Sequence, residues 1–236
     1  MRPSAPDTSE FVLDAPAGLS SRAQAFLASA AVRIDADPGL PDGVIREQMA
    51  QYFGSVDEAF LAYYRAVQRR YLGLRYQSGY FDAQVTYLPV FEPDPDEPEH
   101  VISYAVDTAS VAGASLDGEG KVKIGVDEFE LVEFANLDAL IESDSLFAQC
   151  AQLPAVSKLL PLELEEVRSS LLRPGEHDLV EVPEASGRHS CWFAGPRAAM
   201  FYRSLWFELE LWEAPTVTIW GSDTETVEDI HRGLTM

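Results

Sequence analysis

The chain has 236 residues, of which 47% are hydrophobic and 11% aromatic, so it can bury a substantial core and is not an intrinsically disordered acidic protein. Its 39 acidic and 17 basic residues give a formal net charge of −22. This charge disfavours binding to nucleic acid or to anionic membranes, and it favours a basic protein partner. The simpler alternative is that the charge only maintains solubility.

Cysteine content and hydropathy indicate the compartment. Cys150 and Cys191 are too few for the disulfide framework of a small secreted domain. Neither a signal-peptide pattern nor an apolar run of membrane-spanning length is present in the sequence. The sequence therefore predicts a soluble, cytoplasmic protein.

The first 20 residues, with three prolines, are predicted to be a loose N-terminal arm, and residues 21–236 are predicted to form a single α+β domain. The best-defined helix is expected to begin at Ser55, which forms a Ser-x-x-Glu capping box with Glu58. Gly73 is placed to end this helix in a left-handed conformation. The expected apolar face consists of Val56, Ala59, Phe60, Tyr63, Tyr64, Val67 and Tyr71.

Four arginines, Arg65, Arg69, Arg70 and Arg75, fall within eleven positions at the end of this helix. Arginines interleaved with tyrosines could contact nucleic acid. However, the tyrosines lie on the apolar face, and the net charge of the chain opposes phosphate. We therefore expect these arginines to stabilise the helix end and to pair with local acids.

From residue 76 to residue 132, the runs QVTYLPVF, HVISYAV, KVKIGV and FELVEF are typical of strands, with LDGEG as a turn. They predict an antiparallel meander. Helices are expected again over ANLDALIESDSLFAQCAQ, PLELEEVRSSLL and residues 223–231, where Ser222 and Glu225 form a second possible capping box. The runs DLVEV, SCWFA, LWFELELW and TVTIW are predicted to be strands. Core positions are favoured over interface positions for Trp192, Trp206, Trp212 and Trp220.

The sequence carries no recognisable catalytic, cofactor-binding or metal-binding motif. There is no glycine-rich phosphate loop and no metal-ligand spacing, and acidic pairs are expected by chance among so many carboxylates. Only His189 and Cys191 bring a base and a nucleophile together, on one face of a predicted strand. We therefore predict a non-enzymatic protein, with an unrecognised site near His189 and Cys191 as the alternative.

The order of elements resembles the SUKH superfamily, whose bacterial members often serve as immunity proteins in polymorphic toxin systems. The resemblance covers about residues 41–150. It rests on the helix FLAYYRAVQRRYLGLRY, the hairpin DGEGKVKI and the segment LVEFANLDALIESDSLF. Leu72 replaces the first glycine of the usual YGGL turn, and the acidic stretch at 92–100 is an insertion. The resemblance implies helices packed around a twisted, mainly antiparallel sheet, and a protein that neutralises a cognate toxin, often a nuclease.

An acidic inhibitor would be steered electrostatically to a basic nuclease. Two acidic stretches are therefore the predicted contacts with the partner: Glu92, Asp94, Asp96, Glu97 and Glu99 in the first, and Asp127, Glu128 and Glu130 in the second. An adapter module of the same fold, which binds another regulatory protein, is the alternative.

Overall fold

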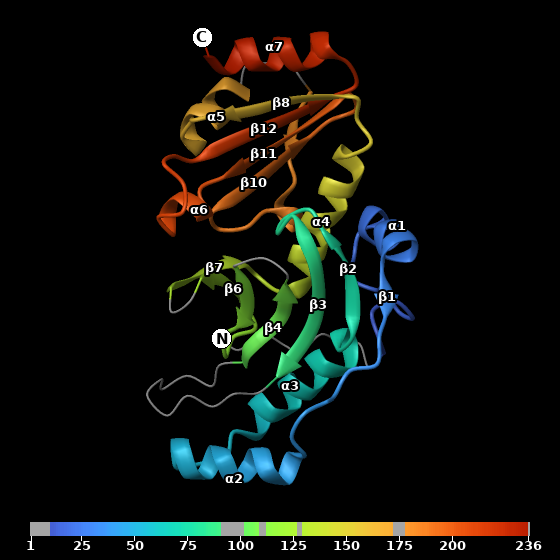
Figure 1. The fold of residues 1–236 in the computed structure, drawn as a ribbon, viewed down its shortest axis with the longest axis vertical. Coiled ribbons are helices and arrows are strands. Elements are labelled where there is room, and N and C mark those ends of the chain that lie inside the picture. Colours follow the sequence, from blue (N-terminus) through green and yellow to red (C-terminus); the bar gives the residue numbers. More distant parts are fainter. Residues whose placement is uncertain (1–9, 91–101, 109–111, 127–128, 172–177, 236) are drawn as a thin grey trace. The chain divides into compact units, whose positions relative to one another are not determined.

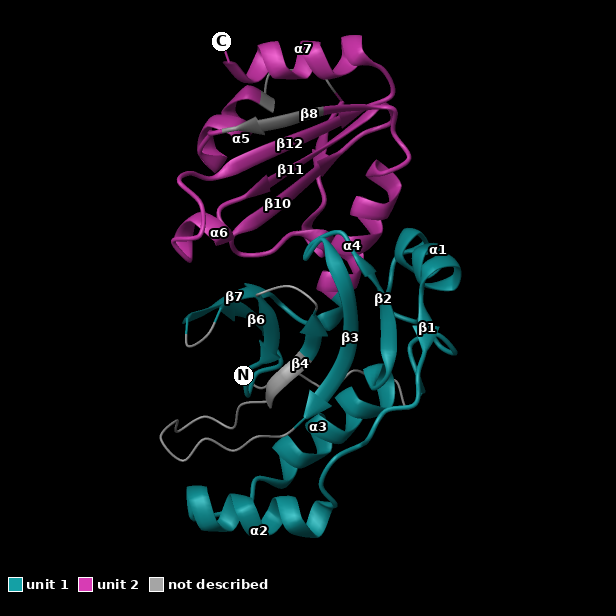
Figure 2. Ribbon diagram, in the orientation of Figure 1, with its two compact units in different colours: residues 1–138 teal, residues 139–236 magenta. Residues whose placement is uncertain are grey.

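The computed structural model describes residues 10–90, 102–108, 112–126, 129–171 and 178–235 (Figure 1). The chain divides into two compact units, residues 1–138 and 139–236 (Figure 2). Each unit has its own antiparallel sheet with helices, which confirms the predicted α+β class. The sequence predicts one domain over residues 21–236, whereas the structure divides there into two units whose boundary lies inside a helix.

Unit 1 is built on a seven-stranded sheet whose order, β1-β2-β3-β4-β5-β6-β7, follows the sequence. Every neighbouring pair is antiparallel, as predicted for the meander. The helices of this unit are α1 (Ser21–Ala30), α2 (Asp42–Phe53) and α3 (Glu58–Tyr71). The strands are β1 (Val32–Arg33), β2 (Leu74–Ser78), β3 (Ala83–Val90), β4 (Ile102–Thr108), β5 (Gly113–Leu116), β6 (Val122–Val126) and β7 (Phe129–Phe134).

Helix α3 packs on strand β3 through part of the predicted apolar face: Phe60, Tyr64 and Val67 are buried. Val56, which precedes the helix, and Ala59 in its first turn are exposed, so the prediction is wrong for these two residues. Its N-cap is Asp57, not Ser55: the Asp57 carboxylate accepts hydrogen bonds from the N–H groups of Ala59 and Phe60. The predicted capping box is therefore wrong, and Glu58 instead pairs with Arg46 at 2.8 Å.

The chain turns sharply after α3 at Gly73, which has the predicted left-handed conformation with φ at +82°. A Cβ atom at this position would lie 2.3 Å from the carbonyl oxygen of Ile34, which belongs to the segment after β1. Glycine is thus required here both by backbone conformation and by close approach of a second backbone.

The hairpin between β5 and β6 is the predicted DGEG turn. One oxygen of the Asp117 carboxylate accepts hydrogen bonds from the N–H groups of Glu119 and Lys121 at 2.8 and 2.9 Å. Gly120 completes the turn with φ at +82°, close to the hydroxyl of Tyr63 on α3. The turn is therefore packed against helix α3.

Residues 10–20 differ from the expected loose arm. Phe11, Val12 and Leu19 are buried, and the N–H of Val12 donates to the carbonyl of Arg70 at 2.9 Å. Burial of these apolar side chains holds the proline-containing stretch against the rest of unit 1. Residues 1–9 lie outside the described residues.

Unit 2 has a five-stranded antiparallel sheet of order β8-β12-β11-β10-β9, which does not follow the sequence. Its helices are α4 (Leu137–Cys150, which begins in unit 1), α5 (Leu164–Leu171), α6 (Leu205–Glu208) and α7 (Thr224–Thr235), with a 3-10 turn at Pro183–Ala185. Its strands are β8 (Ala155–Leu160), β9 (Val180–Glu181), β10 (Ser190–Ala194), β11 (Ala198–Arg203) and β12 (Thr216–Gly221).

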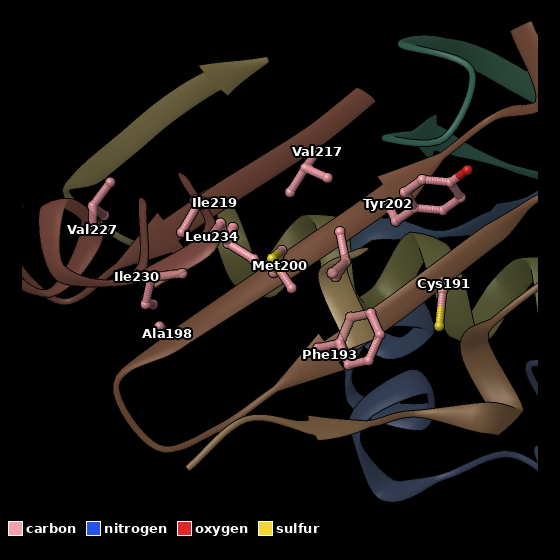
Figure 3. Close-up of a cluster of buried hydrophobic side chains, with 11 residues drawn as sticks. Cys191, Phe193, Ala198, Met200, Tyr202, Val217, Ile219, Val227, Ile230 and Leu234 are labelled. Atoms are coloured by element: carbon pink, nitrogen blue, oxygen red, sulfur yellow. The ribbon is translucent and has the colours of Figure 1, made fainter. Parts of the chain in front are cut away.

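One face of this sheet carries a mainly apolar core, which also includes Cys191 and Tyr202. Alternate residues such as Phe193, Met200 and Ile219 point to this face, where Ile230 and Leu234 of α7 pack on them (Figure 3). Val167 of α5 belongs to the same cluster. Helices α5 and α7 are thus attached to the sheet by hydrophobic burial.

The opposite face carries aromatic rings. Trp192 is fully buried, and its ring centroid lies 4.6 Å from that of Phe201 and 5.7 Å from that of Trp220. Phe147 of α4 packs edge-on against Trp192 at 4.7 Å. The indole N–H of Trp192 donates to the hydroxyl of Ser143 at 2.9 Å, so this burial leaves no polar group unsatisfied on the ring.

The run LWFELELW does not form the predicted strand. Leu205–Glu208 is the short helix α6, and a turn follows in which Glu210 has φ at +57°. Leu205 and Trp206 face the core, whereas Phe207, Leu211 and Trp212 are exposed. The alternation of apolar and polar residues, which is typical of a strand, therefore belongs here to a short helix and a turn. Some of the apolar side chains are buried and the others are exposed.

Candidate protein-binding surface

Of the predicted partner-binding acids, Glu130 is the one that the structure describes. It lies exposed on β7, and the hydroxyl of Ser115 donates to both of its carboxylate oxygens at 3.0 Å. The others lie outside the described residues: Glu92, Asp94, Asp96, Glu97, Glu99, Asp127 and Glu128.

Strand β7 is the last strand of the unit 1 sheet, and in the described part of the chain it pairs only with β6. We call this strand, Phe129–Phe134, the β7 edge. Its first two residues, Phe129 and Glu130, are exposed, and 76% of the surface of Phe129 is accessible. An aromatic ring and a carboxylate therefore stand next to backbone groups of an open sheet edge.

Unit 2 has a second surface of similar chemistry around α6. Three large apolar side chains are exposed within six positions: Phe207 at 43%, Leu211 at 46% and Trp212 at 42%. They are interspersed with the exposed acids Glu208, Glu210 and Glu213. We call these six residues the α6 surface.

A groove of about 440 Å³ adjoins the α6 surface. Leu211 and Trp212 line it together with Pro161 and Pro215, and Glu213 contributes a carboxylate. The groove is therefore mainly apolar with an acidic side, and its size is within the range of sites that accept protein side chains or small ligands.

The arginine cluster mostly has the predicted structural role. The Nε atom of Arg65 donates to the carboxylate of Asp42 at 2.6 Å. Arg75 donates to the hydroxyl of Thr86 at 3.0 Å. Arg69 is exposed and makes no ion pair with the described residues.

Arg70 is the centre of a buried polar cluster, with 1% of its side chain accessible. Its guanidinium donates to both oxygens of Asp138 at 3.1 Å and to the carbonyls of Ala15 and Ala17. The hydroxyl of Tyr71 donates to Asp138 at 2.8 Å. These partners offset the desolvation of the buried guanidinium, so the predicted ion pairing is confirmed here.

A cleft of about 990 Å³ in unit 1 contains part of the arginine cluster. Its charged lining consists of Arg33, Arg65, Arg69, Glu10, Asp14 and Asp35. Because three guanidinium groups face three carboxylates, this lining has no net preference for phosphate. The cleft therefore adds nothing to the nucleic-acid alternative.

His189 and Cys191 have separate partners. His189 Nδ1 lies 3.1 Å from a carboxylate oxygen of Glu208, whereas the sulfur of Cys191 lies 3.8 Å from the hydroxyl of Ser186 in the buried core. Burial, with a contribution from the charge of Glu181, raises the pKa of the Cys191 thiol to about 12. A thiol in this state is a weak nucleophile at neutral pH.

Within the described part of the chain, no three His, Cys, Asp or Glu side chains gather closely enough to hold a metal ion. Among the same residues, no helix has the length and apolar character needed to cross a membrane. Comparison with protein-family models, with characterised proteins and with solved structures found no match to this chain.

The sequence predicts Glu130 as a partner contact, but it does not predict the exposure of Phe129 or the α6 surface. Alternation within FELVEF and LWFELELW indicated a buried face for both runs. The density of glutamates in ELELWE was the available signal for exposure, since carboxylates are rarely buried without partners.

Proposed function

We propose that this protein is a non-enzymatic, cytoplasmic binding protein that acts as an immunity factor: it binds a basic protein partner and neutralises it. The resemblance to the SUKH superfamily supports this role, and a toxin that acts on nucleic acid is the favoured partner, because enzymes that hold phosphate carry basic surfaces. The net charge of −22 would accelerate encounter with such a partner.

The observation that carries the proposal is the β7 edge. An exposed Phe129 beside Glu130 combines an aromatic side chain, a type that is enriched in protein interfaces, with a carboxylate that can pair with a basic partner. The open edge also offers unpaired backbone N–H and C=O groups for strand addition. A basic, extended segment of the partner would satisfy both requirements.

The role is tested by purifying the protein from its native cells, identifying what co-elutes, and expressing that partner alone. We expect a basic partner that is poisonous alone and harmless when this chain is co-expressed. A partner that is harmless alone would remove the immunity role and leave an adapter.

The site is tested with the identified partner and two sets of variants. Phe129→Ser should weaken binding at least about tenfold. Asp127→Asn, Glu128→Gln and Glu130→Gln together should slow association and reduce its dependence on salt. Neutralising Glu92, Asp94, Asp96, Glu97 and Glu99 tests the other predicted stretch in the same assay. If binding and its salt dependence are unchanged in all of these variants, the predicted contacts are wrong.

A further inference from the structure

We propose that the α6 surface of unit 2 is a second docking site, which binds a basic amphipathic helix of a partner protein. This inference rests on the proposed function only in treating the chain as a binding protein. The β7 edge and the α6 surface belong to different units, so each can be tested without the other.

The apolar part of the α6 surface is held in place by the backbone. The N–H groups of Leu211 and Trp212 both donate to the carbonyl of Trp206, at 2.8 and 3.0 Å, and the N–H of Glu210 donates to the carbonyl of Phe207 at 3.0 Å. Because Trp206 is itself buried, the turn is anchored in the core. Leu211 and Trp212 are therefore exposed by a fixed backbone and would lose little entropy on binding.

The backbone of this turn also carries an unfavourable conformation. Glu210 is one of three described non-glycine residues with positive φ, at +57°. Such a conformation costs free energy and persists only where the surrounding structure enforces it. Here it reverses the chain so that Leu211 and Trp212 enter the lining of the groove. Pro161 and Pro215 form other parts of that lining, so apolar anchors from a partner would meet apolar walls.

The negative charges around the groove favour a partner that carries positive charge. Glu208, Glu210 and Glu213 are exposed within six positions. The base in contact with them is His189, which is already paired with Glu208. Glu210 and Glu213 make no ion pair with the described residues, so lysine or arginine side chains on a partner would pair with them, whereas an acidic partner or an anionic lipid surface would be repelled.

The position of the groove in the sheet favours a helix over a strand. The groove includes Thr216, the first residue of β12, and β12 is flanked by β8 and β11 on its two sides. Strand β12 is therefore not an edge, and the edge strand β8 ends at the groove with Pro161, which has no N–H to donate to an added strand. A helix that presents apolar residues at i, i+3, i+4 and i+7, with basic residues beside them, matches an apolar groove with an acidic side.

The test uses the full chain and a labelled helical peptide of leucine and lysine, about 18 residues long, with leucine at the spacing of one helix face. A peptide of the same design with glutamate in place of lysine is the negative probe. Fluorescence anisotropy should show tighter binding of the lysine peptide, and this preference should decline as salt is added.

Two variants of the α6 surface should weaken binding of the lysine peptide. Leu211→Ser with Trp212→Ser should raise the dissociation constant at least about tenfold. Glu208→Gln, Glu210→Gln and Glu213→Gln together should also raise it and should reduce the salt dependence. Because all five side chains are exposed, far-UV circular dichroism should be unchanged in both variants.

Matched variants separate this site from general attraction between a basic peptide and an acidic protein. Glu225→Gln, Glu228→Gln and Asp229→Asn remove the same charge from exposed positions on α7 and should leave binding unchanged. Tyr52→Ser removes an exposed aromatic ring from α2 of unit 1, outside both proposed surfaces, and should also have no effect.

The inference is overturned if the α7 variant weakens binding as much as the triple α6 variant, or if the chain does not prefer the lysine peptide. It is also overturned if the chain is a dimer that Leu211→Ser and Trp212→Ser convert to a monomer, because the occupant would then be a second copy. None of these results bears on the β7 edge.

Discussion

The two units reach the same fold class with different interiors. Unit 1 is a meander whose strands pair in sequence order, and it buries polar groups such as Arg70 and Gln68. The amide nitrogen of Gln68 lies within 3.0 Å of three oxygens, the carbonyls of Pro38 and Pro89 and the hydroxyl of Tyr64, which its two hydrogens share. Unit 2 pairs its strands out of sequence order, fills both faces of its sheet with apolar and aromatic side chains, and buries its charged groups Glu142 and Asp144 on helix α4 instead.

This difference in the interiors determines which substitutions each unit tolerates. A polar interior is specific but depends on every partner being present, whereas an apolar interior depends on volume. We expect unit 1 to be most sensitive to lost hydrogen bonds and tight turns, and unit 2 to lost side-chain volume. All four tryptophans lie in residues 139–236, so tryptophan fluorescence reports on unit 2 alone.

The largest expected effect is in the aromatic face of unit 2. Trp192→Ala removes a fully buried ring that contacts Phe147, Phe201 and Trp220, and it should lower the free energy of unfolding of unit 2 by about 4 kcal/mol. Urea unfolding followed by fluorescence of the remaining tryptophans measures this change. Trp212→Ala is the control, because its exposed ring should be removable with little loss. Equal losses in the two variants would refute a volume-dependent core.

In unit 1 the sharpest steric test is Gly73→Ala. A left-handed backbone and a carbonyl oxygen 2.3 Å from the new Cβ atom should together destabilise unit 1 by about 3 kcal/mol. Gly54→Ala is the matched control, since Gly54 has φ at +73° but has no atom within 4 Å of an added Cβ. Gly54→Ala should lower the free energy of unfolding of unit 1 by only about 1 kcal/mol, the cost of placing alanine in a left-handed backbone conformation.

Circular dichroism should detect the loss in Gly73→Ala while tryptophan fluorescence stays at the wild-type midpoint. A shift of the fluorescence midpoint by the same amount would mean that the two units unfold together. Their free energies of unfolding would then not be separate quantities that can be compared.

The sequence predicted most of unit 1 because its contacts are local. Adjacent strands are adjacent in the sequence, and the turn at Asp117–Gly120 carries its own signal. In unit 2, strand β11 was missed because Ala198–Arg203 is buried on both faces and therefore shows no alternation. The boundary between units was not visible, since α4 continues across it with an unbroken helical pattern.

The candidate surfaces were less predictable than the fold. Sequence patterns identify side chains that could be buried, but the exposure of Trp212 is decided by where the turn after α6 points. The hydrogen bond across the turn, from the backbone N–H of Trp212 to the carbonyl of Trp206, sets that direction. The net charge predicts that the partner is basic, but it does not indicate which of the 39 acidic residues contact that partner.

A smaller effect is expected from the polar interior of unit 1. Asp138→Asn keeps the shape of the side chain but leaves Arg70 buried without its counter-charge, which should cost about 2 kcal/mol. We place the cost below that of a fully buried pair because 25% of the Asp138 side chain is accessible. Circular dichroism in urea measures the loss. Arg46→Met, which breaks the exposed pair with Glu58, is the control and should change stability little.

The smallest expected effect concerns the helix caps, where both units deviate from the predicted capping boxes in the same way. The N–H of Thr226 donates to Asp223, just as two N–H groups at the start of α3 donate to Asp57, and in each case a serine had been predicted as the cap. An aspartate accepts the same hydrogen bonds and adds a negative charge at the positive end of the helix. Asp57→Ala should therefore destabilise unit 1 by about 1 kcal/mol, while Ser55→Ala should have almost no effect.

Asp223→Ala and Ser222→Ala repeat this comparison in unit 2, with tryptophan fluorescence as the measurement. Hydrogen bonds from Thr226, Ser222 and Arg197 hold the pKa of the Asp223 carboxyl well below its usual range. A carboxyl with a depressed pKa stabilises the fold above its unfolded pKa, and this stabilisation is lost as the pH falls toward the folded value. The difference between wild type and Asp223→Ala should therefore shrink in acid. If it instead persists once the carboxyl is protonated, the aspartate acts through packing and its charge contributes nothing to the cap.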